Sequence, residues 1–414
     1  MKSNPLSLFF IFTYLYFITY ILNPLLLIFD DSLITQVIDK PSFDSLIYSI
    51  VYSIIAFLFI LLGYKSKIKK NINLDKNVFL SNKRLILLLL FSIGFFFYIF
   101  WESLLKRFLF NQYVNIFEFS NGNGITMLIL SSYQYIFIFL ILYIYSKLIN
   151  NISIKTIDYI CILLSISILF ISSVLLSTRR DIAVVFLIIV YLLAFFKKER
   201  RYKYLLIITI FSIPFTSVIL QAVRYMNINE FSLDTIIDTL KYTNQFIVSS
   251  FEGHWLAFYF DKVNLFQFLL GVNPFEFIGN LLSYIPRVIW ESKPYNMGIL
   301  EIQYFLAPQS FNEKGYPTVT MPSTILVEIL YSFGFFVSFF ILFYLGKLMK
   351  FLDLVFIYYK DNLILVFLFL YIYIYMFGFI RGGSSFLTGL LIPLVYLLLI
   401  IKYEKIKKRK KNGF

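Results

Sequence analysis

Long apolar runs recur along nearly the whole of this 414-residue chain, and they restrict its fold more than any other feature. Hydrophobic residues make up 60% of the sequence and charged residues only 14%. Soluble domains contain about 45–50% apolar and about 25% charged residues. Several runs reach about 20 residues, the length that an α-helix needs to cross the hydrocarbon core of a bilayer. The sequence therefore predicts an all-α polytopic membrane protein.

About ten transmembrane helices account for the apolar runs, and we expect them to form a single integral membrane domain over residues 1–414. Their approximate bounds are Leu6–Ile28, Ser45–Gly63, Leu85–Trp101, Ile125–Tyr145, Ile157–Leu176, Ile182–Phe196, Tyr204–Leu220, Ser323–Leu345, Leu363–Ile380 and Phe386–Ile401. The first run is longer than the core of a signal peptide, which has about 7–15 residues, so we interpret it as a retained span.

The distribution of lysine and arginine predicts the orientation of the chain. These residues concentrate between spans two and three, between spans six and seven, and in the tail 402–414. The positive-inside rule places all three segments, and hence both termini, in the cytoplasm. Residues 221–322 then form a large extracytoplasmic loop, with short helices expected within 231–251 and 273–284. The net charge of +14 follows from this topology, so it does not indicate a nucleic-acid partner.

Six cations fall on the predicted outer face, where the rule expects few: Arg179, Arg180, Arg224, Arg287, Lys293 and Arg381. The apolar segment below Arg180 covers only about 22–24 Å as a helix, less than a hydrocarbon core of about 30 Å. Guanidinium groups at that depth are stable where they line a wet cavity or bind anions. Pairing with nearby carboxylates is the alternative. Because arginine grips phosphate oxygens with two bonds, we expect a lipid-linked phosphate or diphosphate as the ligand.

Two residues are candidates for a general base. His254 is the only histidine and lies in the predicted outer loop, while Glu328 lies about one turn into an apolar helix. The candidates for sugar stacking are Trp255, Trp290 and Tyr331, and the alternative role of these aromatic residues, as of His254, is anchoring at the membrane interface. One cysteine and one histidine are too few for a disulfide or a Cys/His metal site, so we expect no metal and no other cofactor.

Three short segments resemble bacterial O-antigen and capsule repeat-unit polymerases of the Wzy type. The first is the Ser-Thr-Arg-Arg turn at 177–180. The second is Ile-Pro-Arg at 285–287, followed by Trp290 and Lys293-Pro294. The third runs from Pro322-Ser323 through Glu328 and Tyr331 to Phe333-Gly334. This chain has Arg180 where a glycine often follows the first arginine in that family, which leaves open which arginine acts.

The resemblance implies a glycosyltransferase that polymerises undecaprenyl-diphosphate-linked oligosaccharide repeat units on the outer face of the bacterial cytoplasmic membrane. The partners implied are the lipid-linked donor and acceptor, the bilayer, and a polysaccharide chain-length regulator. Arginines would stabilise the leaving diphosphate without a metal. The preferred candidates for this role are Arg179, Arg180 and Arg287, and the next candidates are Arg224 and Arg381.

Three other functions remain open from the sequence. An O-antigen ligase has similar chemistry and a similar outer loop but a different acceptor. A transferase that uses polyprenyl-monophosphate sugars would need carboxylates in the first outer loop, where Asp30-Asp31 lies. A flippase for lipid-linked oligosaccharides is the non-enzymatic alternative, although such proteins usually carry internal repeats and this chain shows none.

Overall fold

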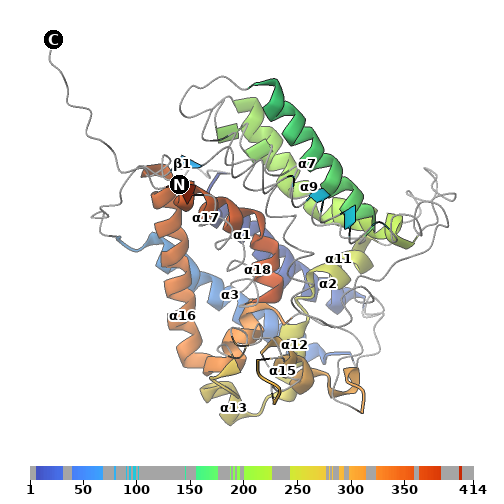
Figure 1. Ribbon diagram of the computed structural model, residues 1–414. Coiled ribbons are helices and arrows are strands. Elements are labelled where there is room, and N and C mark those ends of the chain that lie inside the picture. Colours follow the sequence, from blue (N-terminus) through green and yellow to red (C-terminus); the bar gives the residue numbers. More distant parts are fainter. Residues whose placement is uncertain are drawn as a thin grey trace. The chain divides into compact units, whose positions relative to one another are not determined.

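The computed structural model gives the backbone of the following residues (Figure 1). They are 6–30, 40–68, 79–80, 90, 93–94, 97–98, 101, 145, 155–175, 187, 190–191, 194–195, 200–225, 243–276, 279, 282, 289–292, 298–313, 323–358, 363–383 and 401–402. The chain divides into two compact units. The first consists of Met1–Ile68, Leu193–Phe351 and Tyr373–Gly389, and the second of Lys69–Leu192, Leu352–Ile372 and Leu390–Phe414.

Three continuous helical segments in the described ranges are long and apolar enough to cross a membrane: Leu8–Phe29, Phe43–Lys65 and Ile325–Tyr358. A fourth candidate is the pair α17 (Leu363–Ile374) and α18 (Met376–Gly382), which passes the same test only if its break counts as part of one span. These helices are those of a membrane protein, as the composition predicts.

The first candidate span contains a π-helical turn in its middle. Helix α1 (Leu8–Phe17) continues through η1 (Ile18–Leu22) into α2 (Asn23–Phe29). Pro24 lies just after the π turn, and proline both lacks an amide N–H and clashes with the carbonyl four residues before it. The wider turn relieves this clash, and π turns of this kind are frequent at functional sites. Asn23 and Thr19 lie at this irregularity, and both are fully buried.

Helices α3 (Phe43–Lys65) and α16 (Ile325–Tyr358) cross at two glycines. A side chain at Gly63 would begin 1.9 Å from the carbonyl oxygen of Phe343, and one at Gly346 would begin 1.9 Å from that of Ile60. Only glycine allows this close approach of two helix backbones, a common way of packing membrane helices. Near the same crossing, Lys350 Nζ donates to the carbonyl oxygen of Ser66 at 2.5 Å.

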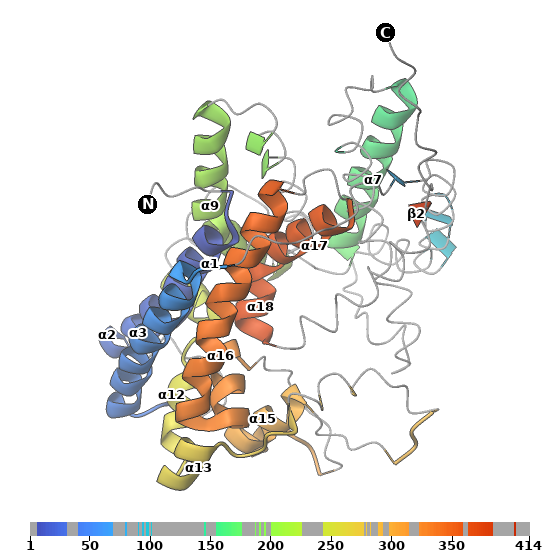
Figure 2. The same cartoon turned by 90° about the vertical axis from the view of Figure 1, so that its left-hand side faces the viewer.

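Short helices from the predicted outer loop gather at the end of α16 where that helix begins (Figures 1 and 2). They are α12 (Trp255–Lys262), α13 (Leu265–Leu270), α15 (Ile299–Leu306) and the 3-10 turn η4 (Pro308–Ser310). Helix α11 (Thr243–Phe251) packs against both α2 and α9 (Arg200–Tyr225), and α12 packs against α3. The loop is thus built onto the ends of the candidate spans within the first unit.

A glycine pair interrupts α16 near its start. Gly334 has φ 68° and ψ −177°, so the helix breaks there. A side chain at Gly334 would begin 2.5 Å from the backbone nitrogen of Gly271, which itself has φ 89° and closes α13. The amides of Val272 and Asn273 both donate to the carbonyl of Tyr331, at 2.6 and 3.2 Å. Positive φ and backbone contact both require glycine at these two positions.

In the second unit, the described elements are α7 (Thr156–Leu175), most of α17, the end of α16 and a two-residue strand pair. Strand β1 (Phe79–Leu80) pairs antiparallel with β2 (Ile401–Lys402). The ring of Tyr191 lies 6.2 Å from that of Phe356 and 6.3 Å from that of Phe369, and the two phenylalanine rings stack at 4.0 Å.

The predicted spans can be compared with these elements one by one. Helices cover the predicted spans 6–28, 45–63, 157–176, 204–220, 323–345 and 363–380, although the fifth of these is broken at Gly334 and the last at Tyr375. The spans 85–101, 125–145, 182–196 and 386–401 lie mainly outside the described residues. The helical character of the chain is confirmed, while the number of ten spans and the orientation stay predictions.

Candidate functional site

A buried polar cluster in the first unit joins three of the residues that the sequence singled out: His254, Glu328 and Arg381. We call this group, together with Glu252 and Asn23, the polar cluster. Its members come from the start of α2 just after the π turn, the segment between α11 and α12, the first turn of α16 and the end of α18. The topology predicts all four segments at the outer face.

The centre of the polar cluster is an ion pair between Arg381 and Glu252. Arg381 donates from Nη2 to Glu252 Oε1 at 2.8 Å and from Nε to Oε2 at 3.2 Å, a bidentate contact. The Glu252 side chain is 8% exposed, whereas that of Arg381 is 35% exposed. Burial raises the pKa of Glu252, and the neighbouring guanidinium opposes this rise without cancelling it. A guanidinium has five N–H donors, so Arg381 keeps three for a further acceptor.

His254 lies two residues after Glu252, and Asn23 fixes its orientation. The Asn23 amide donates from Nδ2 to the carbonyls of Ile247 and Val248, at 3.4 and 3.0 Å, which turns Oδ1 towards the histidine. The backbone N–H of His254 donates to this oxygen at 3.2 Å, and ring atom Nδ1 lies 3.3 Å from it. Because Oδ1 only accepts hydrogen bonds, Nδ1 carries the proton and Nε2 has the free lone pair.

Burial determines the charge of this histidine. His254 is 5% exposed, and desolvation lowers its pKa to about 4. The ring is therefore neutral at pH 7 and can accept a proton at Nε2, but it is a weak base. An anion bound next to the ring would favour the protonated form and raise this pKa.

The backbone around these residues permits no side chain at Gly253. A Cβ there would lie 1.6 Å from the carbonyl oxygen of Thr19 in the π turn. Glu252, just before it, has φ 53°, the one positive φ of a non-glycine residue in the described backbone. Such a conformation costs about 1–2 kcal/mol and is found preferentially at functional sites. The close approach to the π turn and the ion pair hold Glu252 in place.

Glu328 lies in the first turn of α16, with 1% of its surface exposed. Its carboxylate is next to Gly383, the residue that ends α18, because a Cβ on Gly383 would begin 1.6 Å from Oε2. Tyr20 joins the same two helices, since its hydroxyl donates to the carbonyl of Ile380 at 3.2 Å and accepts from the amide of Leu326 at 3.2 Å. Glu328 and Arg381 therefore lie on two adjoining helix ends, the start of α16 and the end of α18.

Three buried hydroxyls close to this region have no hydrogen-bond partner among the described residues. They belong to Thr19 and Thr324, which are fully buried, and to Ser323, which is 3% exposed. Buried polar groups in native proteins nearly always have a partner, which can be water or a ligand.

A second group of polar side chains lies one turn further along α16. Tyr331 donates to Glu301 Oε1 at 3.1 Å, and Asn273 Nδ2 donates to the same oxygen at 2.6 Å. Ser332 donates to Glu276 Oε2 at 3.0 Å, and Glu276 is 1% exposed. Tyr331, which the sequence suggested for sugar binding, thus belongs to this second group rather than to the polar cluster.

The remaining predicted residues divide into those that the structure describes and those that it does not. The first set is Trp255, Trp290 and Asp30. Trp255 is 2% exposed and lies with its ring centre 5.8 Å from that of His254, while Trp290 is half-buried and donates from Nε1 to Ser292 Oγ at 3.1 Å. Asp30 caps the end of α2. The second set lies outside the residues or side chains that the structure describes: Asp31, Arg179, Arg180, Arg224, Arg287 and Lys293.

Sequence reasoning missed Glu252 and Asn23. A signal existed for Asn23, because it interrupts an apolar run just before a proline, and a polar residue inside a span is expensive unless it has a role. Within the described residues, no group of three or more His, Cys, Asp or Glu side chains is arranged to hold a metal ion. Comparison of the chain with protein-family models, curated proteins and solved structures gives no match.

Proposed function

We propose that this protein is a repeat-unit polymerase, a glycosyltransferase that joins undecaprenyl-diphosphate-linked oligosaccharides on the outer face of a bacterial cytoplasmic membrane. In the reaction, a hydroxyl oxygen of the acceptor sugar attacks the anomeric carbon of the donor. The bond from that carbon to the phosphate oxygen breaks, and undecaprenyl diphosphate leaves with the electron pair. The hydroxyl proton passes to a base. No oxidant, reductant or nucleotide is consumed.

The observation that carries the proposal is a partly exposed guanidinium, that of Arg381, bound to Glu252, which lies two residues before a neutral histidine that Asn23 orients. Arg381 retains donors for the diphosphate oxygens, and its bidentate contact with Glu252 holds its plane in position. Donors that are preorganised where negative charge develops are usually the largest catalytic contribution. The predicted outer cations Arg179, Arg180, Arg224, Arg287 and Lys293 would complete the diphosphate site.

His254 is the first candidate for the base, because its Nε2 lone pair is free and Asn23 fixes the required tautomer. A pKa of about 4 is too low for an efficient base at neutral pH, but a bound diphosphate would raise it. Glu328 remains the second candidate, since its buried carboxylate lies against Gly383 in the same region. The resemblance to repeat-unit polymerases is the reason for proposing this substrate. The polar cluster is the reason for proposing a diphosphate leaving group.

Reconstitution tests this proposal. Purified protein in proteoliposomes is incubated with a synthetic undecaprenyl-diphosphate repeat unit, and the products are separated by size. A ladder of lengths is expected, and Arg381→Met should reduce its rate by about 10²–10³-fold, the usual cost of one charge-stabilising donor. Lys350→Met removes a cation that bonds to the end of α3, away from the polar cluster, and should leave the rate unchanged.

Three results would contradict the proposal. A single transfer to a lipid A acceptor would indicate a ligase, and movement of the intact lipid-linked unit across the bilayer would indicate a flippase. Equal activity of the wild type and the Arg381→Met variant would show that the polar cluster takes no part in the reaction.

A further inference from the structure

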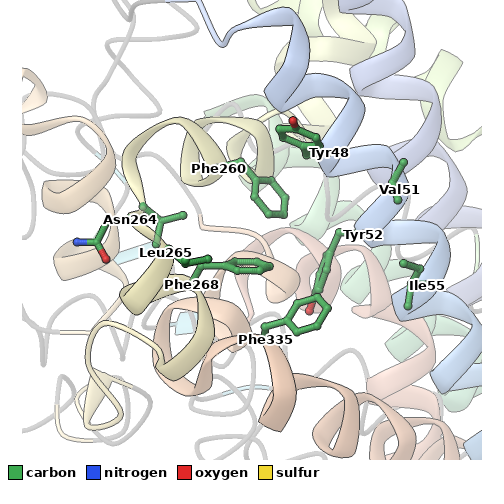
Figure 3. Close-up of a pocket in the computed structure, with 10 residues that line it drawn as sticks. Tyr48, Val51, Tyr52, Ile55, Phe260, Asn264, Leu265, Phe268 and Phe335 are labelled. Carbon is green, nitrogen blue, oxygen red and sulfur yellow. The ribbon is translucent and has the colours of Figure 1, made fainter.

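An apolar groove lies on the side of the first unit, between a candidate membrane span and two loop helices (Figure 3). Its volume is about 420 Å³, within the range of about 300–1,000 Å³ that is usual for ligand sites. One wall is α3, which contributes Val51, Tyr52 and Ile55. The other walls are phenylalanine rings from three helices: Phe260 of α12, Phe268 of α13 and Phe335 of α16.

The surroundings of the groove indicate a hydrocarbon occupant. Other residues on the exposed surface of α3 are apolar, including Ile54 and Leu58, whose exposed fractions are 49% and 51%. A helix of this length and composition meets acyl chains rather than water over such a face. With α3 as a membrane span, the groove would open sideways into the bilayer.

Two of the polar side-chain atoms that line the groove already have partners. The hydroxyl of Tyr52 donates to Ser338 Oγ at 2.9 Å. The side chain of Asn264 accepts from the amide of Gln267 at 2.9 Å as the cap of α13. An occupant with hydrogen-bonding groups would gain nothing from these atoms, whereas a hydrocarbon chain only needs the apolar rings.

Helix α12 connects the groove to the polar cluster. His254 caps its beginning and Phe260 lies six residues later, a separation of about 9 Å along the helix axis. Between them, Tyr259 donates to the carbonyl of Leu330 at 3.3 Å and holds α12 against the first turns of α16. A lipid with its phosphate at the polar cluster would therefore have its first hydrocarbon units within reach of the groove.

We infer that the groove holds the polyprenyl chain of the lipid-linked substrate whose diphosphate binds at the polar cluster. This inference rests on the proposed function. Five aromatic side chains around the groove, Tyr48, Tyr52, Phe260, Phe268 and Phe335, give flat rigid walls that suit the planar double bonds of isoprene units. The groove holds only the part of the chain nearest the phosphate, and the rest extends into the bilayer.

Photolabelling tests the occupant directly. Undecaprenyl phosphate with a diazirine on an isoprene unit near the phosphate is added to the full-length protein in nanodiscs, and labelled residues are identified by mass spectrometry. Labels are expected on α3 between residues 48 and 55 and on α13. Val51→Trp or Ile55→Trp, which fill the groove, should abolish this labelling. Leu58→Trp, about one turn beyond Ile55 on the same helix and outside the groove, should not.

Kinetics supply the second measurement. Val51→Trp should raise KM about tenfold for a substrate with the full undecaprenyl chain, which corresponds to losing about two buried methylene groups. With a substrate whose diphosphate carries a methyl group in place of the polyprenyl chain, Val51→Trp and wild type should have the same KM. Equal effects of Val51→Trp and Leu58→Trp, or labelling of the groove by a diazirine phospholipid as strongly as by the polyprenyl probe, would overturn the inference.

The two measurements separate this inference from the proposed function. If the groove is labelled but the protein has no polymerase activity, the proposed reaction is refuted, while binding of the polyprenyl chain in the groove is supported. If the protein makes a ladder of products but its groove takes no label, the proposed reaction is supported, while binding of the polyprenyl chain in the groove is refuted.

Discussion

Removing either partner of the Arg381–Glu252 ion pair should lower the free energy of unfolding, and the size of the loss should depend on which partner is removed. In Arg381→Met, the Glu252 carboxylate, 8% exposed, loses its counter-charge and stays buried, which costs about 3 kcal/mol, the lower end for a broken buried pair. In Glu252→Gln, the guanidinium is 35% exposed and water can solvate it, so the cost is about 1 kcal/mol.

The double variant Glu252→Gln with Arg381→Met leaves no buried charge, and its stability should return to within about 1 kcal/mol of the wild type. The coupling between the two sites is then about 3 kcal/mol or slightly more. Because burial already raises the pKa of Glu252, the deficit of Arg381→Met should also shrink at acid pH, where this carboxyl takes up a proton.

The assay is the apparent Tm of the four purified proteins in one detergent at pH 7 and pH 5. Activity separates structure from catalysis, because the double variant should be stable yet inactive while Glu252→Gln keeps the guanidinium and most of the rate. A double variant that melts as early as Arg381→Met, or that polymerises at the wild-type rate, would refute the reasoning.

Three further predictions concern the polar cluster and the α16 break. Gly253→Ala places a methyl group 1.6 Å from the Thr19 carbonyl oxygen and should lower the apparent Tm by the equivalent of about 1–3 kcal/mol, whereas Gly94→Ala, with open space around it, should not lower it. Gly334→Ala combines φ 68° with a contact of 2.5 Å to backbone and should reduce expression of folded protein, measured by size-exclusion chromatography. The pKa of His254 falls to about 4 on folding from a usual value of about 6.5, so stability is complete above about pH 6.5 and declines by about 3 kcal/mol as pH falls to 4. His254→Gln should flatten this part of the Tm–pH curve.

The sequence predicted the helical membrane architecture because apolar runs report directly on burial in lipid. The predicted span Ser45–Gly63 lies within α3, which extends from Phe43 to Lys65. The breaks inside α16 and after α17 were not predicted. Glycine is common in membrane helices, and only the contact between Gly334 and the α13 end shows why this glycine ends a helix segment.

The candidate site was predicted in part. His254, Glu328 and Arg381 stood out because each is a rare residue type in an apolar setting, and the structure brings all three into one region. Glu252 and Asn23 were missed because their roles arise from contacts across 129 and 231 positions of sequence. No local pattern encodes such separations, and only the fold reveals that one carboxylate pairs with the arginine and one amide orients the histidine.

The binding of a lipid diphosphate beside His254 is the central claim, and the single histidine of this chain allows a direct measurement. Protein labelled with ¹⁵N-histidine in nanodiscs gives one imidazole to titrate by NMR, with and without undecaprenyl diphosphate. Without the lipid, the pKa should be about 4. With the lipid, the anion should raise it by at least about one unit, and Arg381→Met should weaken the lipid concentration dependence. An imidazole pKa that stays at the same value when saturating lipid is added would contradict the account.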